Sequence, residues 1–296
     1  MTQSDYRKKN YKELVTSYYE VITNFYRKFW NDSFHLAVFQ NSRESFEEAL
    51  ARTDRMYMED SGLNKNKSAI DLGCGIGTLA CYVARETKCQ SILGITISPS
   101  QVKLAKQMAK QKKLANTSFL HMDVMEVDAL KDKFDTAFLI EVGCHLPDKT
   151  EAIKKISKIL KPGGRLIIAD WLQKERPNVF ERDFLIEPFC EYWNYPYLET
   201  ISGYKKIIEK AGFRIVRAED FSEQIKPNWE KFYRIAIEEV QQFNLIRALR
   251  YTTNPAILVG KDLMKFAKYQ FNANVFAKIC SDAGVLKFAY FVAEKK

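Results

Sequence analysis

Glu141 and His145 are the residues of this sequence best suited to moving a proton. They lie four residues apart in the segment 140–149 (IEVGCHLPDK), directly after a predicted buried strand. A loop that bends from this strand into a helix turns both side chains toward one pocket, where a carboxylate and an imidazole act as general acid and base. The alternative is structural: a glutamate that caps the helix and a histidine that is hydrogen bonded in the core.

The segment 70–77 (IDLGCGIG) carries the strongest binding motif. A strand runs into a glycine-rich turn and then into a helix, and Asp71 lies two residues before the first glycine. Dinucleotide sites use the spacing G-x-G-x-x-G, which brings pyrophosphate to a helix amino terminus. The spacing G-x-G-x-G after an acid suits an amino-acid-bearing nucleoside instead. We predict that Asp71, Gly73, Gly75 and Gly77 bind such a cofactor.

At this turn the chain resembles the Rossmann-like S-adenosylmethionine-dependent methyltransferases, and in particular the tocopherol and sterol C-methyltransferases. The segment 94–101 (GITISPSQ) is similar to their G-[IL]-T-L-S-x-x-Q stretch, which implies that Thr96 and Gln101 bind the ribose. Asp123 lies where the resemblance implies a contact with the adenine amino group, and capping of a helix is its alternative role. The implied cofactor is S-adenosyl-L-methionine, with S-adenosyl-L-homocysteine as product.

The predicted substrate end resembles two groups of enzymes. The segment 140–149 is similar to the I-E-x-x-C-H-x-P-D stretch of the sterol enzymes and to the E-S-G-E-H-M-P-[DN]-K stretch of the tocopherol enzymes. Residues 18–46 follow the sterol pattern, whereas segments between 192 and 289 follow the tocopherol pattern. Each aromatic residue among the predicted substrate contacts has core packing as its alternative. The predicted substrate-binding residues are Tyr19, Trp30, His35, Tyr192, Trp193 and Tyr197.

Two reactions fit these residues. In C-methylation of an isoprenoid alkene or a prenylated phenol, aromatic faces and a base stabilise a cation and remove its proton. N-methylation of a small amine or alkaloid is the alternative, because the same base would deprotonate an amine. A prenyl diphosphate, held by Lys or Arg and magnesium, is a further option for the substrate. A module that only binds a nucleoside has no need of acid–base groups and is disfavoured.

The elements that must position these residues alternate along the chain from residue 68. Short apolar strands separated by helices are typical of a parallel sheet covered on both faces, with ligands at its carboxyl edge. We predict an α/β fold with a Rossmann-like, doubly wound, mostly parallel seven-stranded sheet. Predicted strands are 68–72, 91–96, 118–121, 134–140, 165–171, 213–219 and 285–293, and predicted helices are 78–87, 98–113, 149–160 and 202–211.

The chain divides into three predicted parts. Residues 1–60 form an amino-terminal segment with two helices and a substrate loop at 30–39, and residues 61–173 form the cofactor-binding core. Residues 174–296 contain helices and the last two strands of the sheet. Within this part we expect residues 174–200 and 224–284, called the cap below, to close over the carboxyl edge as a mobile, helical cover. In the cofactor-binding core, a turn at 161–164 (KPGG) ends the predicted helix 149–160.

Composition restricts the setting of this chemistry. The chain has 296 residues, of which 46% are hydrophobic and 28% charged, which predicts a globular protein rather than a disordered one. Six cysteines without a C-x-x-C pair predict reduced thiols and no metal site. No export signal, bilayer-spanning segment or nucleic-acid motif is expected, despite the net charge of +9. We expect a cytoplasmic enzyme of specialised metabolism with a small lipophilic substrate, and its oligomeric state is left open.

Overall fold

Seven strands form one sheet at the centre of the computed structural model, which describes residues 2–41, 43–241 and 261–296. The strands are β1 (Ser68–Leu72), β2 (Ser91–Thr96), β3 (Thr117–His121), β4 (Phe134–Ile140), β5 (Leu160–Gln173), β6 (Phe213–Asp220) and β7 (Leu286–Lys295). Their order is β3-β2-β1-β4-β5-β7-β6. The pairs from β3 to β5 are parallel, whereas β7 is antiparallel to β5 and β6. The predicted doubly wound fold is thereby confirmed.

β5 shows why the middle of the sheet is an almost continuous apolar run. Its side chains alternate between two buried layers, with Ile167 and Trp171 on one face and Ile168 and Leu172 on the other. A strand that is covered on both faces needs apolar residues at successive positions rather than at every second one. The apolar run therefore indicates a central strand.

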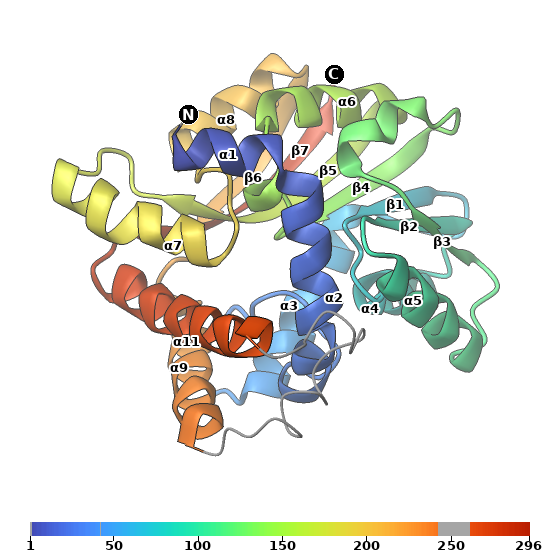
Figure 1. The fold of residues 1–296 in the computed structure, drawn as a ribbon. Helices are drawn as coiled ribbons and strands as arrows, with labels where there is room; N and C mark the ends of the chain where they lie inside the picture. The colour runs from blue at the N-terminus through green and yellow to red at the C-terminus, as the bar shows by residue number, and fades with distance from the viewer. Residues whose placement is uncertain (1, 42, 242–260) are drawn as a thin grey trace.

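Helices cover both faces of this sheet (Figure 1). α3 (Phe46–Ser61), α4 (Thr78–Thr87) and α5 (Pro99–Gln111) pack on the face that contains Trp171. α6 (Lys149–Ile159) and α8 (Ile201–Lys210) pack on the opposite face. Short 3₁₀ helices, η1 (Val124–Ala129) and η2 (Gly143–His145), follow β3 and β4. The helices predicted in the core correspond to α4, α5, α6 and α8.

The amino-terminal part contains one helix more than predicted. The two predicted helices correspond to α2 (Tyr11–Phe29) and α3, and α1 (Gln3–Lys9) precedes them. α1 begins with a capping box in which Thr2 and Asp5 satisfy each other's backbone amides. Arg7 of α1 is buried and donates a hydrogen bond of 2.6 Å to the carbonyl oxygen of Tyr195. This contact between distant parts of the chain holds α1 in place.

The predicted turn at 161–164 lies inside β5 instead of before it. Phe134 of β4 pairs with Leu160, and the regular register resumes only where Thr136 pairs with Arg165. The intervening residues form an irregularity in which Gly163 has a φ of +72°. The Pro-Gly-Gly sequence therefore marks a bulge, which is the other structure that such residues favour at a strand.

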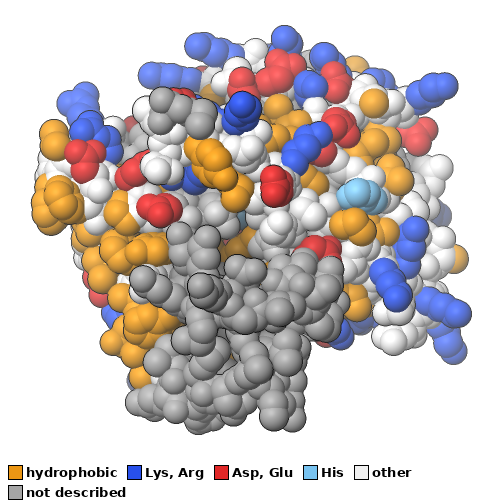
Figure 2. All heavy atoms as spheres, in the orientation of Figure 1, with side chains coloured by type: hydrophobic (Ala, Val, Ile, Leu, Met, Phe, Trp, Pro, Cys, Tyr) orange, Lys and Arg blue, Asp and Glu red, His pale blue; other side chains and the backbone are white. Residues whose placement is uncertain are grey.

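The described part of the cap is helical. It contains the π-helical segment η3 (Glu181–Ile186), α7 (Glu187–Tyr192), α9 (Lys226–Gln241) and α11 (Lys261–Asp282), and its residues 242–260 lie outside the described part of the chain. Figure 1 shows α7 and α11 next to each other at the left, with α2 to their right. On the face drawn in Figure 2, hydrophobic side chains gather at the left over η3, α7 and α11. In the described ranges, no helix has both the length and the hydropathy that a membrane span requires.

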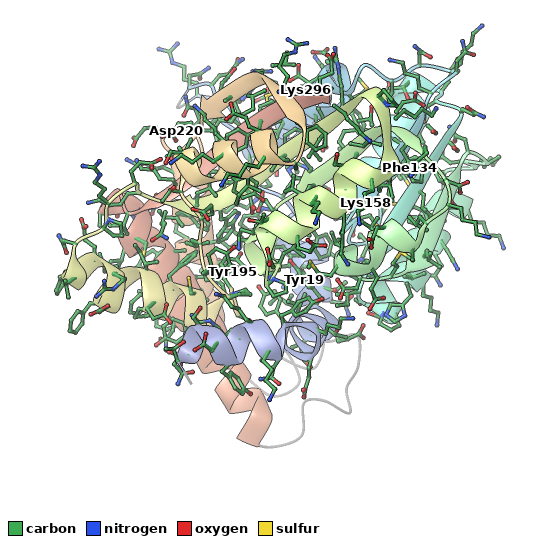
Figure 3. All side chains as sticks on the ribbon, turned by 90° about the horizontal axis from the view of Figure 1, so that it is seen from above. Tyr19, Phe134, Lys158, Tyr195, Asp220 and Lys296 are labelled. Atoms are coloured by element: carbon green, nitrogen blue, oxygen red, sulfur yellow. The ribbon has the colours of Figure 1, made fainter. Side chains whose placement is uncertain are left out.

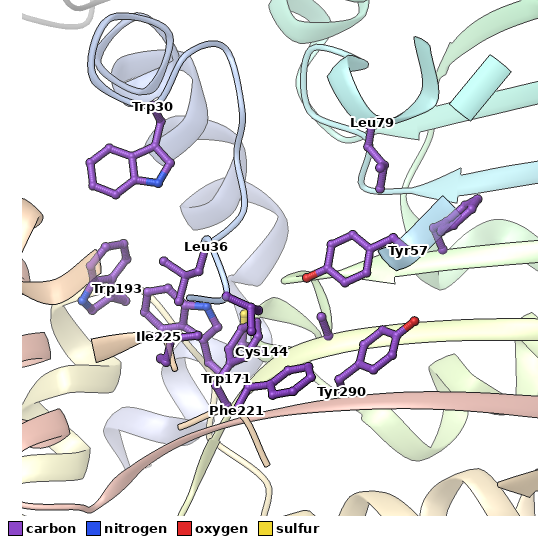
Figure 4. Close-up of a cluster of buried hydrophobic side chains, with 14 of the residues drawn as sticks. Trp30, Leu36, Tyr57, Leu79, Cys144, Trp171, Trp193, Phe221, Ile225 and Tyr290 are labelled. Atoms are coloured by element: carbon purple, nitrogen blue, oxygen red, sulfur yellow. The ribbon is translucent and has the colours of Figure 1, made fainter. Parts of the chain in front are cut away.

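Trp171 lies at the centre of an aromatic cluster that joins the sheet to the cap (Figure 4). Its ring is edge-on to Trp193, at 4.9 Å between ring centroids, and to Trp229, at 4.8 Å. Trp30, after α2, is fully buried and stacks on Phe232 of α9 at a centroid distance of 3.8 Å. These contacts make α2, β5 and the cap parts of one core.

Replacing Trp30 by alanine should therefore destabilise the whole protein. Loss of a buried tryptophan from a packed core costs about 3–5 kcal/mol of unfolding free energy, because the cavity is only partly filled. Denaturant titration followed by circular dichroism measures this loss. Phe180→Ala is the control, since Phe180 is 62% exposed and its loss should change stability by about 0.5 kcal/mol or less. Equal losses in the two variants would contradict the core role of Trp30.

Candidate active site

A pocket lies at the carboxyl edge of the parallel strands and is covered by α2. Its lining comes from the turn after β1, the ends of β2 and β4, the segment after β3, the loop at 33–35 and α2. The parallel strands explain this convergence, because their carboxyl ends meet at one edge of the sheet. The predicted site residues in the lining are Tyr19, His35, Asp71, Gly73, Gly75, Thr96, Gln101, Asp123, Glu141 and His145.

The glycine turn is held tightly against its neighbours. The amide of Gly73 donates a hydrogen bond of 2.8 Å to the carbonyl oxygen of Ile95, which fastens the turn to β2. A Cβ at Gly73 would lie 2.4 Å from Val142, so the turn and the loop after β4 approach closely only because this residue is glycine. Gly75 has a φ of +53° and forms part of the pocket lining.

Asp71 shows that the pocket is built to receive a polar ligand. The residue is 3% exposed, and its Oδ2 has no hydrogen-bond partner among the described residues. Burial raises the pKa of its carboxyl group to about 7. A buried carboxylate oxygen without a partner is costly, and a donor such as the amino group of the predicted cofactor would satisfy it. Asp71 and the glycine turn therefore fit the predicted cofactor.

Thr96 and Gln101 lie side by side at the end of β2. The Thr96 hydroxyl donates to Oε1 of Gln101 at 2.7 Å, and Nε2 of Gln101 donates to the hydroxyl of Thr23 at 3.3 Å. Both side chains are buried within the pocket wall. The predicted contact with the ribose stays a prediction, and the structure adds Thr23 of α2 to this polar group.

Asp123 caps a helix, which is one of the two roles that the sequence left open. It caps η1, because its carboxylate accepts a hydrogen bond from the amide of Met125 at 2.8 Å. It also lines the pocket, where it accepts a short hydrogen bond from the Tyr11 hydroxyl and lies 3.1 Å from Nζ of Lys12. The adenine contact stays a prediction. The structure shows that α2 reaches this carboxylate.

The sequence interpretation missed part of the contribution of α2. Tyr11, Val15 and Tyr19 follow one another at intervals of four residues, and all three line the pocket. This spacing places side chains on one face of a helix. The periodicity was visible in the sequence, but it does not distinguish a helix face that packs on a core from one that covers a ligand.

Glu141 has both carboxylate oxygens occupied. Oε1 accepts a hydrogen bond from the amide of Leu36 at 2.5 Å, and Oε2 accepts one from the indole of Trp171 at 2.7 Å. The side chain is buried, and burial raises its pKa to about 7 against the opposing effect of these donors and of His35. Glu141 is therefore a buried acid group, fixed in place by two donors, whose neutral and ionised forms are close in free energy near pH 7.

His145 is paired with Tyr19 rather than with Glu141. Its Nε2 is hydrogen bonded to the Tyr19 hydroxyl at 3.0 Å, and its Nδ1 is buried without a partner among the described residues. Burial, followed by the charge of Lys149, lowers the pKa of His145 to about 3. Tyr19 and Tyr195, which pack on the imidazole, lie side by side (Figure 3). The imidazole is thus neutral near pH 7.

His35, unlike His145, is positively charged near pH 7. Its Nδ1 donates to the Leu36 carbonyl oxygen at 3.0 Å, and its Nε2 is bonded to Asp54 at 2.8 Å. Although burial lowers its pKa, the Asp54 carboxylate outweighs this effect and raises the pKa of His35 to about 9. His35 is therefore an imidazolium in the pocket wall, and its charge favours the ionised form of Glu141.

Some predicted site residues lie outside the pocket lining. Gly77 precedes α4, where an added Cβ would lie 2.6 Å from Phe119, so it serves the packing of α4. Trp30 and Trp193 belong to the buried core. Tyr192 is partly buried against α11. Tyr197 lies under the ammonium group of Lys149, which is 3.6 Å from its ring centroid. Contact of these residues with cofactor or substrate stays a prediction.

Comparison with known proteins relates the chain to methyltransferases. A family model described as a methyltransferase domain matches residues 63–238. The sterol 24-C-methyltransferase ERG6 of Saccharomyces cerevisiae is 30% identical over 222 residues, which are 73% of this chain but only 57% of that protein. The chloroplastic tocopherol O-methyltransferase of Arabidopsis thaliana is 26% identical over 79% of this chain and 72% of its own length.

A solved structure has the same fold. The mycolic acid cyclopropane synthase CmaA1, complexed with S-adenosylhomocysteine (SAH) and CTAB, superimposes with a TM-score of 0.76. The alignment covers 94% of this chain and 95% of that one at 15% sequence identity. At this identity the likeness concerns the fold alone.

Gly75→Ala should weaken the binding of S-adenosylhomocysteine at least about tenfold, because the added Cβ enters the pocket wall beside Phe34. Isothermal titration calorimetry measures the affinity. Gly163→Ala is the matched control, because Gly163 also has a positive φ, +72°, and has open space around it. Both variants should lose similar stability, about 1 kcal/mol. Equal affinity in the two variants would contradict a cofactor site at this turn.

The charge states of the histidines can be read directly, because the chain has only 3. In an NMR titration of the imidazole groups, the His145 signals should stay those of a neutral ring from about pH 8 to about pH 5. The signals of His35 should stay those of an imidazolium until the pH approaches about 9. Single His→Gln variants assign the signals. A midpoint near the ordinary value of about 6.5 for His145 would show that its environment does not suppress protonation.

Proposed function

The chain belongs to the methyltransferase domain family, as its sequence predicted. We propose that it transfers a methyl group from S-adenosyl-L-methionine to a carbon atom of a lipophilic isoprenoid alkene or prenylated phenol. The observation that carries this proposal is the neutral His145–Tyr19 pair beside a buried, fixed Glu141. The S-adenosylhomocysteine in a structure of the same fold supports the choice of cofactor.

The proposed reaction assigns one task to each group. The bound cofactor supplies an electrophilic methyl group. An electron-rich carbon that takes it becomes part of a carbocation, which must lose a proton. His145 accepts that proton, because its imidazole is neutral and one nitrogen has no partner among the described residues. Tyr19, hydrogen bonded to the other nitrogen, fixes the ring orientation.

Glu141 has an electrostatic task in this proposal. Both of its oxygens already accept hydrogen bonds, so the carboxyl group has a fixed place, and its ionised form would stabilise the cation from there. Tyr19 and Phe34, whose rings lie 6.4 Å apart in the pocket wall, present aromatic faces that stabilise positive charge. The cap at 174–200 and 224–284 is proposed to exclude water from the reacting groups.

The charge of the pocket argues against a prenyl diphosphate as substrate. Its described lining contains the carboxyl groups of Asp71, Asp123 and Glu141 and no lysine or arginine. The His35 imidazolium is also in the lining, but both of its ring nitrogens are already bonded, to Leu36 and Asp54. A diphosphate needs cationic donors close to its oxygens. An uncharged, lipophilic acceptor agrees better with the apolar residues that fill the rest of the lining, which include Val15, Leu79, Ile97, Met122, Val124, Val142 and Leu146.

N-methylation of a small amine is the second candidate, and the same charges favour it. An ammonium group would be attracted to the carboxylates of the lining, and the pair Glu141 and His145 would take its proton and release the nucleophilic nitrogen. Glu141, whose pKa burial raises to about 7, is the stronger base of the two. The two candidates therefore use the same acid–base pair and differ in what methyl transfer leaves behind: a carbocation in one case and a stable amine in the other.

Mass spectrometry of the products separates them. The protein is incubated with labelled methyl donor and a panel of sterol, quinol, prenyl diphosphate and amine substrates. The proposal predicts a labelled carbon-methylated product from the uncharged isoprenoids. Methyl transfer only to amines would support the second candidate, and transfer only to a diphosphate would overturn the charge argument.

Variants of His145 and Glu141 test the assignment of tasks. His145→Ala should slow turnover about 10²- to 10⁴-fold. If the reaction passes through a carbocation, both His145→Ala and Glu141→Gln should also divert product to other alkenes or trapped cations. An amine substrate permits no such diversion. S-adenosylhomocysteine binding checks that the pocket is intact, and His121→Ala, outside the pocket lining, is the control. Wild-type turnover with a single product in both variants would refute the assignment.

A further inference from the structure

A lysine and an aspartate that the proposed reaction does not use are buried beneath the loop that carries His145. Lys149, the first residue of α6, and Asp170, near the end of β5, are both 0% exposed. Replacing buried charges by apolar side chains of similar size is often neutral or stabilising. Stability alone therefore gives no reason to keep charged residues at these two positions.

Their contacts bind the backbone on both sides of His145. Oδ1 of Asp170 accepts a hydrogen bond from the amide of Cys144 at 3.1 Å. Nζ of Lys149 donates to the carbonyl oxygens of Leu146 at 3.3 Å and of Tyr197 at 3.0 Å. The residue before His145 and the residue after it are thus each held by one buried charged side chain.

The loop that carries His145 also packs closely against Asp170 and Tyr204. The Tyr204 hydroxyl of α8 donates to Oδ2 of Asp170 at 2.9 Å. A Cβ added at Gly143 would lie 2.0 Å from the Tyr204 oxygen and 2.2 Å from the Asp170 carboxylate. Only a residue without a side chain fits between them, so the first residue of η2 rests on the Asp170–Tyr204 pair.

We propose that Lys149 is a positioning residue for methyl transfer, which holds the His145 loop in place and sets a positive charge near its imidazole, with Asp170 as its counter-charge. This inference rests on the proposed function, because it matters for catalysis only if His145 accepts a proton. Lys149 acts through the loop and through its charge, and it is absent from the described pocket lining.

Electrostatics supports the second half of this proposal. The titratable groups around His145 are Tyr19 of α2, Tyr195 after α7, Cys144 and Glu141 of its own loop, Asp170 of β5 and Lys149 of α6. After burial, the charge of Lys149 is what lowers the pKa of His145. Burial lowers the pKa of Lys149 itself to about 8, and the Asp170 charge opposes this fall. The ammonium form therefore persists at neutral pH.

Two substitutions separate charge from hydrogen bonding. Lys149→Gln removes the charge but keeps a donor for the Leu146 carbonyl, whereas Lys149→Met removes both. In each variant, the His145 proton affinity in the NMR titration should rise at least about tenfold. Because a rise of about tenfold still leaves the imidazole neutral near pH 7, Lys149→Gln, which keeps a donor for the loop, should retain most of its turnover. Lys149→Met should stay slower at every pH, because its loop is no longer held.

Lys155→Met is the matched control. Lys155 lies on the same helix and also donates to a backbone carbonyl, that of Met125 at 2.8 Å, but it faces Asp128 instead of the His145 loop. Its replacement should leave the titration of His145 unchanged. If one Lys149 variant does not fold, the other gives the same titration test.

An unchanged His145 titration in a folded Lys149 variant overturns the inference, whatever the turnover. The titration needs no substrate, so its outcome is separate from that of the proposed function. A protein that methylates no member of the substrate panel while its His145 titration responds to Lys149 as expected would refute the proposed function. It would leave the effect of Lys149 on the imidazole established.

Discussion

The hydrogen-bonded carboxylate of Glu141 is the interaction on which the arrangement of this site depends. It accepts from the amide of Leu36 and from the indole of Trp171, and so joins the amino-terminal loop, β4 and β5 at one buried point. Trp171 in turn packs edge-on against tryptophans of the cap. Because burial alone would protonate this group, its charge depends on both donors staying in place. Loop, sheet and cap are thereby coupled through one side chain.

Local patterns predicted most of the fold, whereas the partners in the site required the structure. Strand ends and the glycine turn depend on residues that are close together in the sequence, so periodicity and turn chemistry predict their positions. The four-residue spacing of Glu141 and His145 suggested a pair. Glu141 has a φ of +56°, however, and its side chain meets Leu36, 105 residues away, while His145 meets Tyr19. Such long-range contacts, like the core position of Trp30, leave no local signal.

The site combines acids and bases whose pKa values are displaced in opposite directions by the same cause. Burial raises the pKa of Asp71 and Glu141 and lowers that of His145 and Lys149. Near pH 7, these shifts bring the neutral and ionised forms of Asp71, Glu141 and Lys149 closer in free energy, and they favour the neutral form of His145. A protein selected only for stability would replace these groups by apolar ones. Displaced pKa values gathered at one place are typical of functional sites, and they agree with the proton transfer proposed here.

The shared fold determines where a cofactor lies more strictly than it determines what is methylated. The glycine turn and the ends of β2 and β3 belong to the sheet, and their placement follows from parallel strand order. The acceptor side is built from α2, the loop at 33–35 and the loop after β4, which the sheet constrains only at their ends. Relatives named for methylation of a sterol carbon and of a tocopherol oxygen agree with this division. The acceptor atom is therefore decided on these loops rather than in the sheet, and the roles proposed for His145 and Glu141 belong to that side of the site.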